Sequence, residues 1–141
     1  MTIKQFNERF QHTLPITVAW SDMDALAHVN NAKFFRYLES ARVDFLQQYE
    51  HLMPMPRVGV GPILAFIECQ FMRPLTFPDE IVVGSSVTEV GNTSVKLEQE
   101  IFSARLEDMV ARSMSVLVLI DYSTGEKIRV PDAVRELARP S

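Results

Sequence analysis

The spacing of hydrophobic residues changes within the first third of the chain. Residues 14–20 are rich in β-branched and aromatic side chains and predict a strand, whereas residues 21–30 have the polar, irregular composition of a loop. From Asn30 onward, apolar side chains recur every three or four residues, which predicts one long amphipathic helix that Asn30 or Asn31 is suited to cap. We expect residues 53–56, Met-Pro-Met-Pro, to end it. Its apolar positions are Phe34, Phe35, Leu38, Ala41, Phe45, Leu46 and Tyr49.

The remainder of the chain alternates between apolar and polar residues with a period of two, as strands do. The first of these strands carries Ile63, Ala65, Ile67, Cys69 and Phe71 on one face and stops at Pro74. Three further strands are expected over residues 80–90, 93–103 and 109–122, followed by a turn at residues 123–125 and a short helix that starts at Pro131-Asp132.

The order of these elements predicts the fold. Short connections between successive long strands imply antiparallel neighbours. Since only one long helix is available to cover the sheet, the expected arrangement is α+β, with a mostly antiparallel sheet wrapped around that helix. No repeat or linker interrupts the pattern, so we expect one domain over residues 1–141. A long strand left unpaired at the edge of a sheet would promote aggregation. Because pairing of edge strands between two subunits would remove this risk, we expect a homo-oligomer, at least a dimer.

Composition and charge restrict the function. The chain has 141 residues, of which 47% are hydrophobic and 23% charged, as in globular proteins rather than disordered or membrane proteins. Its formal charge of −4 gives no cationic excess for nucleic acid or anionic lipid, so neither is an expected partner. Residues 1–12 lack the apolar core of a secretory signal, and Cys69 is the only cysteine. We therefore expect a soluble, cytoplasmic protein without disulfides.

Chemically useful side chains are concentrated in the loop before the long helix. The N-terminus of a helix carries partial positive charge and unpaired N–H groups, which stabilise a carbonyl oxygen that becomes negative. Asp24 lies seven residues before Asn31, close enough for its carboxylate to fold back toward the first helical turn and act as a nucleophile or general base. The polar residues of this loop are Ser21, Asp22, Asp24, His28, Asn30 and Asn31.

Residues 20–42, WSDMDALAHVNNAKFFRYLESAR, resemble the signature of hotdog thioesterases of the 4-hydroxybenzoyl-CoA thioesterase type. The similarity lies in the aromatic residue two before the first acid, the two acids Asp22 and Asp24, and the His-Val-Asn-Asn run. It continues with an aromatic residue three or four positions into the helix and with Glu39 and Ala41-Arg42 one turn further on. It extends more loosely through residues 71–74, 91–94 and 117–121, and so covers nearly the whole chain.

This resemblance implies a hotdog fold and the hydrolysis of acyl-CoA to free acid and CoA, without a cofactor. It implies that Asp24 is the catalytic carboxylate and that the backbone N–H of Asn31 polarises the thioester carbonyl. Relatives carry an aromatic residue near the Asn31 position, where this chain has Asn-Asn. The resemblance further implies a site between two subunits within a homotetramer. Candidates for holding the nucleotide end of CoA are Arg73, Lys96, Arg105 and Arg112.

Other roles remain open for the neighbours of Asp24. Asp22 is a substrate-binding candidate or a residue that bonds backbone and holds the loop. His28 is a base, a substrate contact or an ordinary loop histidine, and Asn30 is a substrate contact or the helix cap. Asp22, Asp24 and His28 do not have the spacing of a zinc or calcium motif, so we expect no metal site.

Three functions remain in competition. The first is acyl-CoA thioesterase, the second a non-catalytic hotdog module that binds acyl-CoA, and the third a hotdog dehydratase that uses His28. A serine hydrolase is not expected, because the chain has no Gly-x-Ser-x-Gly elbow. We also expect Glu39 to pair with Arg42 on the helix, and Cys69 to be buried and inert.

Overall fold

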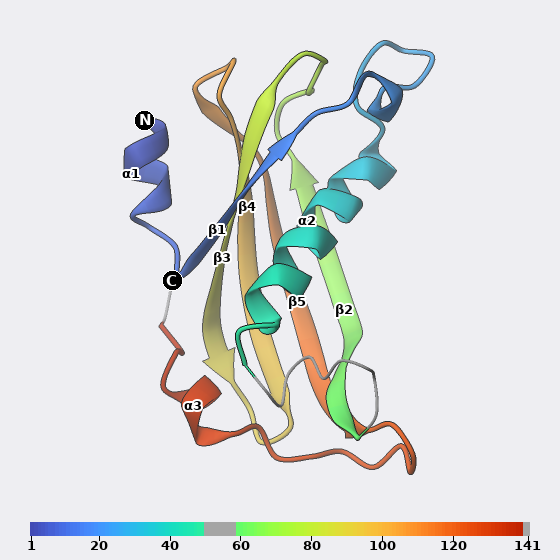
Figure 1. The fold of residues 1–141 in the computed structure, drawn as a ribbon, viewed down its shortest axis with the longest axis vertical. Helices are drawn as coiled ribbons and strands as arrows, with labels where there is room; N and C mark the ends of the chain where they lie inside the picture. The colour runs from blue at the N-terminus through green and yellow to red at the C-terminus, as the bar shows by residue number, and fades with distance from the viewer. Residues whose placement is uncertain (50–58, 140–141) are drawn as a thin grey trace.

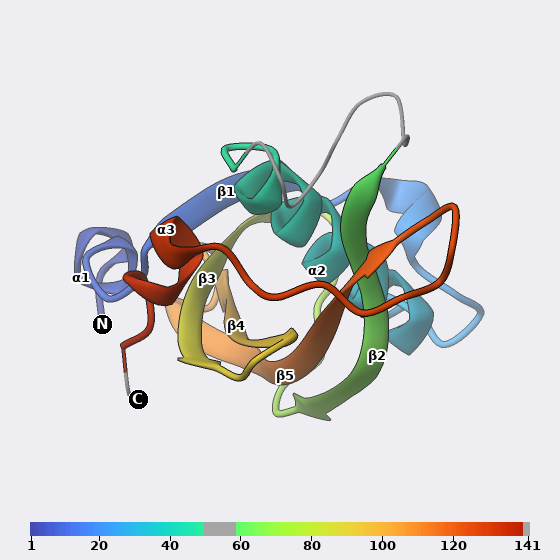
Figure 2. The ribbon, with the colours of Figure 1, turned by 90° about the horizontal axis from the view of Figure 1, so that it is seen from below.

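The computed structural model describes residues 1–49 and 59–139, which form an antiparallel sheet and its covering helices (Figure 1). The strand order is β1-β3-β4-β5-β2, with all neighbours antiparallel. The sheet curves around α2 when it is seen along its length (Figure 2), which confirms the predicted α+β arrangement. The elements are α1 (Ile3–Asn7), β1 (His12–Thr17), η1 (Trp20–Asp22), α2 (Asn31–Leu46), β2 (Val60–Phe71), β3 (Glu80–Val90), β4 (Ser94–Ser103), β5 (Asp108–Asp121) and α3 (Asp132–Arg135).

The four strands after α2 agree with the sequence pattern within a few residues, and β3 agrees at both ends. The first strand differs, because β1 stops at Thr17 and does not reach residue 20. Thr17 lies opposite Glu80, the first residue of β3, so the strand ends where its hydrogen-bonding partner begins. The following residues turn instead into the short 3-10 helix η1, whose first residue is Trp20.

The amphipathic helix begins as predicted and ends earlier. Asn30 is its N-cap, and the Asn30 side chain accepts a hydrogen bond from the Ala32 N–H at 2.8 Å. The helix ends at Leu46 and its C-cap is Gln47, so Tyr49 lies in the turn beyond it. The proline-containing segment that was expected to end the helix lies outside the described residues.

The partners along α2 also differ from the expectation. Glu39 pairs with Arg36, 3.0 Å away and one turn earlier, rather than with Arg42. Arg42 is buried, and this burial lowers the pKa of its guanidinium. Phe35, predicted as a core position, is exposed, whereas the unpredicted Tyr37 is buried. The cause is geometric, since the buried face of α2 is centred on Phe34, Leu38, Ala41 and Phe45.

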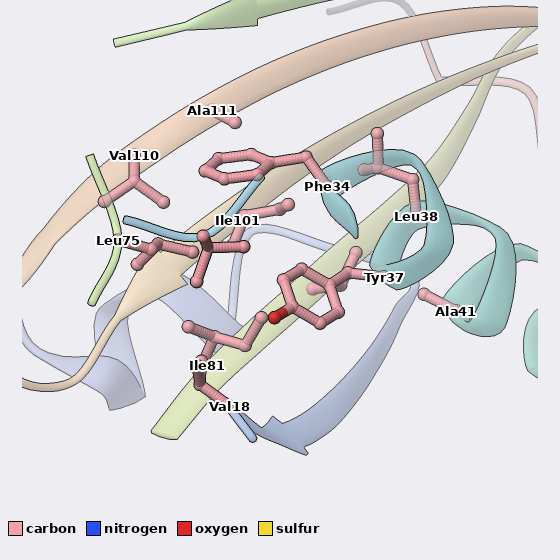
Figure 3. Packing of buried hydrophobic residues seen from close by; sticks show 12 residues of the cluster. Val18, Phe34, Tyr37, Leu38, Ala41, Leu75, Ile81, Ile101, Val110 and Ala111 are labelled. Carbon is pink, nitrogen blue, oxygen red and sulfur yellow. The ribbon is translucent and has the colours of Figure 1, made fainter. Parts of the chain in front are cut away.

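The inner face of the sheet holds two hydrophobic clusters, one beneath each half of α2. The cluster beneath the N-terminal half joins Phe34, Tyr37 and Leu38 to buried residues of β3, β4 and β5 and of the loops (Figure 3). The row Ser85–Gln99–Ser113 crosses the sheet in register between the clusters. The Gln99 amide donates to the Leu38 carbonyl and to Ser85 Oγ, both at 3.0 Å, which attaches the helix to the sheet at its middle.

Strand β2 forms one edge of the sheet and keeps large apolar side chains in contact with solvent. Ile63, Leu64, Phe66 and Phe71 are 40–49% exposed. Cys69, on the same strand, is half-buried rather than fully buried, and desolvation raises the pKa of its thiol to about 11. The thiol is therefore protonated at neutral pH. No helix among the described residues is long and apolar enough to cross a membrane.

Candidate active site

The loop between η1 and α2 is closed by its own backbone. Met23 and Val29 form an isolated antiparallel bridge, and the Asp24 N–H donates to the His28 carbonyl at 2.9 Å. The Ala27 N–H donates back to the Asp24 carbonyl at 3.0 Å. Ala27 has a φ of 60°, in the left-handed region, which is energetically unfavourable for a residue other than glycine. The loop is thus a tight turn that presents Asp24 at one end and leads into the helix at the other.

Asp22 attaches this loop to the helix. Its Oδ2 accepts hydrogen bonds from the Tyr37 hydroxyl at 2.7 Å and from the Ala19 N–H at 3.0 Å, and Lys33 Nζ lies 3.8 Å from Oδ1. The Asn30 N–H donates to the Asp22 carbonyl at 3.1 Å. Burial and the Asp22 carboxylate both raise the pKa of Tyr37, so its hydroxyl stays protonated and keeps donating. Asp22 holds the loop through backbone and side chain.

Asp24 differs from Asp22 in exposure and in bonding. Its residue is exposed, and Oδ1 accepts a hydrogen bond from the Leu26 N–H at 2.9 Å in an Asx turn. Oδ2 faces the Asn30 amide, with Nδ2 at 3.4 Å. One carboxylate oxygen is therefore committed to the loop, and the second has a single, long contact within the described residues.

The first turn of α2 offers an unpaired donor next to this carboxylate. The N–H groups of Ala32 and Lys33 are satisfied by Asn30, through its side chain and its carbonyl respectively. The N–H of Asn31 has no hydrogen-bond partner among the described residues. Because the helix dipole adds positive charge at this end, the Asn31 N–H can stabilise an oxygen that gains negative charge.

A pocket of about 400 Å³ connects these groups. Asp24, His28, Asn30 and Asn31 supply its polar wall. Its apolar wall includes Phe34 and Phe71, whose rings pack edge to face at 5.2 Å between centroids. An apolar pocket with a few converging polar groups is the usual form of a small-molecule site.

The structure brings most of the predicted residues together. Asp24, His28, Asn30 and Asn31 line the same pocket, and Asp22 lies behind them as the anchor described above. Tyr37, the partner of Asp22, was not predicted, because nothing in the helical pattern distinguishes a buried tyrosine with a bonded hydroxyl from a core position.

The four cationic candidates for the nucleotide end of CoA do not converge. Arg73 lines the pocket and also pairs with Asp108 at 3.1 Å. Lys96 and Arg112 line a separate, charged hollow beside Arg9. Arg105 donates to Thr76 Oγ1 at 2.7 Å, away from the pocket. Only Arg73 of this set is placed to meet a bound molecule at the pocket.

Metal binding finds no support in the side chains around the pocket. Asp22 and Asp24 point to different partners, and His28 makes no side-chain hydrogen bond within residues 1–49 and 59–139. Across those ranges, no three His, Cys, Asp or Glu side chains are grouped closely enough to hold a metal ion.

The chain is similar in sequence and in structure to several bacterial proteins. The long-chain acyl-CoA thioesterase FadM of Escherichia coli strain K12 is 26% identical over 121 residues, which cover 86% of this chain and 92% of FadM. The PA2801 protein of Pseudomonas aeruginosa superposes with a TM-score of 0.82 and 28% identity over 89% of this chain and 95% of its own. A thioesterase of Thermus thermophilus, solved in complex with coenzyme A and Zn, superposes with a TM-score of 0.76 and 28% identity over 91% of this chain and 97% of its own.

These similarities confirm the hotdog fold that the resemblance of the sequence predicts. The family profile of the thioesterase-like superfamily matches residues 18–137, which include the loop, α2 and the strands β2 to β5. Because that match spans most of the chain, the protein belongs to the thioesterase-like superfamily.

Proposed function

We propose that this protein hydrolyses acyl-CoA thioesters, with Asp24 as the catalytic carboxylate and the Asn31 N–H as the donor to the thioester oxygen. The observation that carries the proposal is that an exposed carboxylate and an unpartnered helix N–H line one partly apolar pocket within the described residues. The similarity to a long-chain acyl-CoA thioesterase and to a thioesterase solved with coenzyme A supports the substrate class. In this proposal residues 1–141 act as one thioesterase domain.

The Asn31 N–H and the helix dipole act on charge that develops during the reaction. As the thioester carbon is attacked, its carbonyl oxygen becomes negative and accepts the Asn31 hydrogen bond more strongly than before. One preorganised donor of this kind lowers the activation free energy by about 3–4 kcal/mol. Phe34 and Phe71 supply the apolar wall against which an acyl chain packs.

Two routes are compatible with Asp24 Oδ2. In one, Oδ2 attacks the thioester carbon, the C–S bond breaks, and the CoA thiolate leaves and takes a proton; water then hydrolyses the acyl-aspartyl anhydride. In the other, Oδ2 accepts a proton from water while the water oxygen forms the new C–O bond and the thiolate leaves. Mass spectrometry of the protein after a millisecond acid quench distinguishes them, because only the first adds the acyl mass to Asp24.

The exposed edge strand leads us to propose a dimer through β2, and a tetramer built from two such dimers. The apolar side chains of Ile63, Leu64 and Phe66 are exposed on an edge strand, which a second copy of β2 would cover. Phe71 belongs both to this strand and to the pocket, so the partner would help to close the site. Phe66→Lys should lower the mass measured by light scattering to that of the monomer, and an unchanged mass would contradict pairing through β2.

The proposed activity is tested with Asp24→Asn, which keeps the shape of the side chain and removes its negative charge. We expect kcat for CoA release from a panel of short-chain, long-chain and aromatic acyl-CoAs to fall by about 10²- to 10⁴-fold. Asp132→Asn, at an exposed acid in α3, is the matched control and should retain the parental rate.

The alternatives give different results in the same experiment. A non-catalytic acyl-CoA-binding module would bind members of the panel without releasing thiol from any. A dehydratase would release no thiol and would remove water from a 3-hydroxyacyl-CoA in a reaction that His28→Gln abolishes. Parental thiol release by Asp24→Asn would contradict the assignment of Asp24.

A further inference from the structure

The Asn30 side chain contacts both halves of the proposed catalytic apparatus. Its Oδ1 accepts the Ala32 N–H at 2.8 Å and so caps α2. Its Nδ2 donates to Asp24 Oδ2 at 3.4 Å. Because an amide carries its acceptor and donors in one plane, a single orientation of Asn30 serves the helix start and the carboxylate together.

The two oxygens of Asp24 are held from opposite sides. The Leu26 N–H binds Oδ1 at 2.9 Å and limits rotation of the carboxylate within the loop. Asn30 Nδ2 is the only hydrogen-bond donor to Oδ2 within the described residues. Oδ2 is thus the oxygen that is available for attack or proton transfer, and the Asn30 amide is its contact within the described residues.

We propose that Asn30 is a positioning residue, whose amide holds Asp24 Oδ2 in a fixed relation to the N–H of Asn31. The inference rests on the proposed function and gives Asn30 a different role from the predicted substrate contact. Catalytic hydrogen bonds in ligand-free proteins are often long and shorten when substrate binds, which fits the 3.4 Å separation. Through these two bonds the Asn30 amide connects the Asp24 carboxylate to the start of α2.

Asn30→Ser separates this role from capping. Serine caps a helix about as well as asparagine, so α2 and the melting temperature should be preserved, but the hydroxyl is too short to replace the amide at Asp24. Because small displacements of a reacting group slow a reaction strongly, we expect kcat to fall about 10- to 100-fold while KM stays within about twofold of the parental value. Asn7→Ser, at an exposed position in α1, is the matched control. Parental kcat, or a rise in KM at parental kcat, would overturn the proposal.

The pH dependence of an Asn30→Asp variant tests the contact with Asp24, because a purely structural role of Asn30 would leave that pH dependence unchanged. Aspartate also caps a helix, but its carboxylate would face Asp24 Oδ2 and disfavour ionisation of Asp24. The acidic limb of the pH profile of kcat/KM should therefore move to higher pH, and an unmoved limb would contradict the contact.

Failure of this inference is distinguishable from failure of the proposed function. If Asp24→Asn is inactive and Asn30→Ser keeps the parental kcat, only the positioning role is wrong. If Asp24→Asn keeps the parental rate, Asp24 is not the catalytic group and both are wrong.

Discussion

The two ends of α2 have opposite characters within one helix. At the C-terminal end, Phe45 and Leu46 are almost fully buried among residues of β3, β4, β5 and α3. At the N-terminal end, Asn30 and Asn31 are exposed and the Asn31 N–H is without a partner among the described residues. The Gln99 bond to the Leu38 carbonyl lies between them.

This difference shows how the fold divides stability from chemistry. Burial of large apolar side chains at one end provides the free energy that anchors the helix. The other end can then leave a donor unpaired and a carboxylate exposed, as a reacting carbonyl requires. The comparison predicts that substitutions at the C-terminal end change unfolding and those at the N-terminal end change turnover.

The largest expected effect lies at the C-terminal end. Phe45→Ala removes a ring that packs on His12 and Tyr49 and leaves a cavity, so the free energy of unfolding should fall by about 3–5 kcal/mol in urea denaturation. Per folded molecule, kcat should stay close to the parental value. A selective loss of kcat at full folding would break the division between the two ends.

The next effect lies at the N-terminal end. Proline is well tolerated at the first position of a helix, and Asn30 already has the extended backbone that precedes proline, with φ of −62° and ψ of 140°. Asn31→Pro therefore deletes one N–H and leaves the helix intact. We expect kcat to fall about 10²- to 10³-fold with little change in melting temperature. Asn31→Ala keeps the N–H and so measures how much of the fall in kcat is due to the side chain. Equal rates for the two variants would exclude the N–H as the donor.

Tyr37→Phe probes the attachment of the loop and should have an intermediate effect. Loss of the hydroxyl leaves Asp22 Oδ2 with the Ala19 N–H, and the free energy of unfolding should fall by about 1–3 kcal/mol. Folding raises the pKa of Tyr37 above its ordinary value of about 10. The protonated Tyr37 hydroxyl therefore contributes fully to the free energy of unfolding below about pH 10, and this contribution is lost as the pH rises further. Urea denaturation between pH 8 and pH 11 should show a steeper alkaline loss in the parent than in the variant; equal slopes would contradict this.

The smallest effect belongs to the exposed side of the same helix. Arg36→Ala breaks the pair with Glu39, whose side chains are 73% and 51% exposed. Exposed pairs at this spacing contribute a few tenths of a kcal/mol, so stability should change by less than about 0.5 kcal/mol. A loss above about 1 kcal/mol would mean that this side of α2 is covered in solution.

Local pattern predicted most elements, and several of its failures trace to contacts distant in sequence. The bounds of β3 and the start of α2 were predicted correctly because apolar spacing and capping residues act within a few positions, whereas α2 ends earlier than predicted. The end of strand β1 was predicted three residues too late, since it depends on where β3 begins. Helix α1 was not predicted, although Thr2 and Gln5 form a capping box and Phe6 packs on Val82 and Phe102.

The candidate site shows the same limit. The sequence placed Asp24, His28, Asn30 and Asn31 in one loop, and the structure places them in one pocket. It could not show that Asp22 bonds Tyr37, or that Arg73 and not Lys96 lies at the pocket, because these depend on how the loop and strands meet in space.

The sequence alone determined the helix, the strands, the acid pair before the helix and the resemblance to hotdog thioesterases. Each of these depends on residues that lie close together along the chain. Only the tertiary structure decided which acid is an anchor and which is exposed, and which end of α2 carries the core. Hydrogen bonding and burial depend on neighbours brought together by folding, and two aspartates separated by one residue receive different roles from those neighbours.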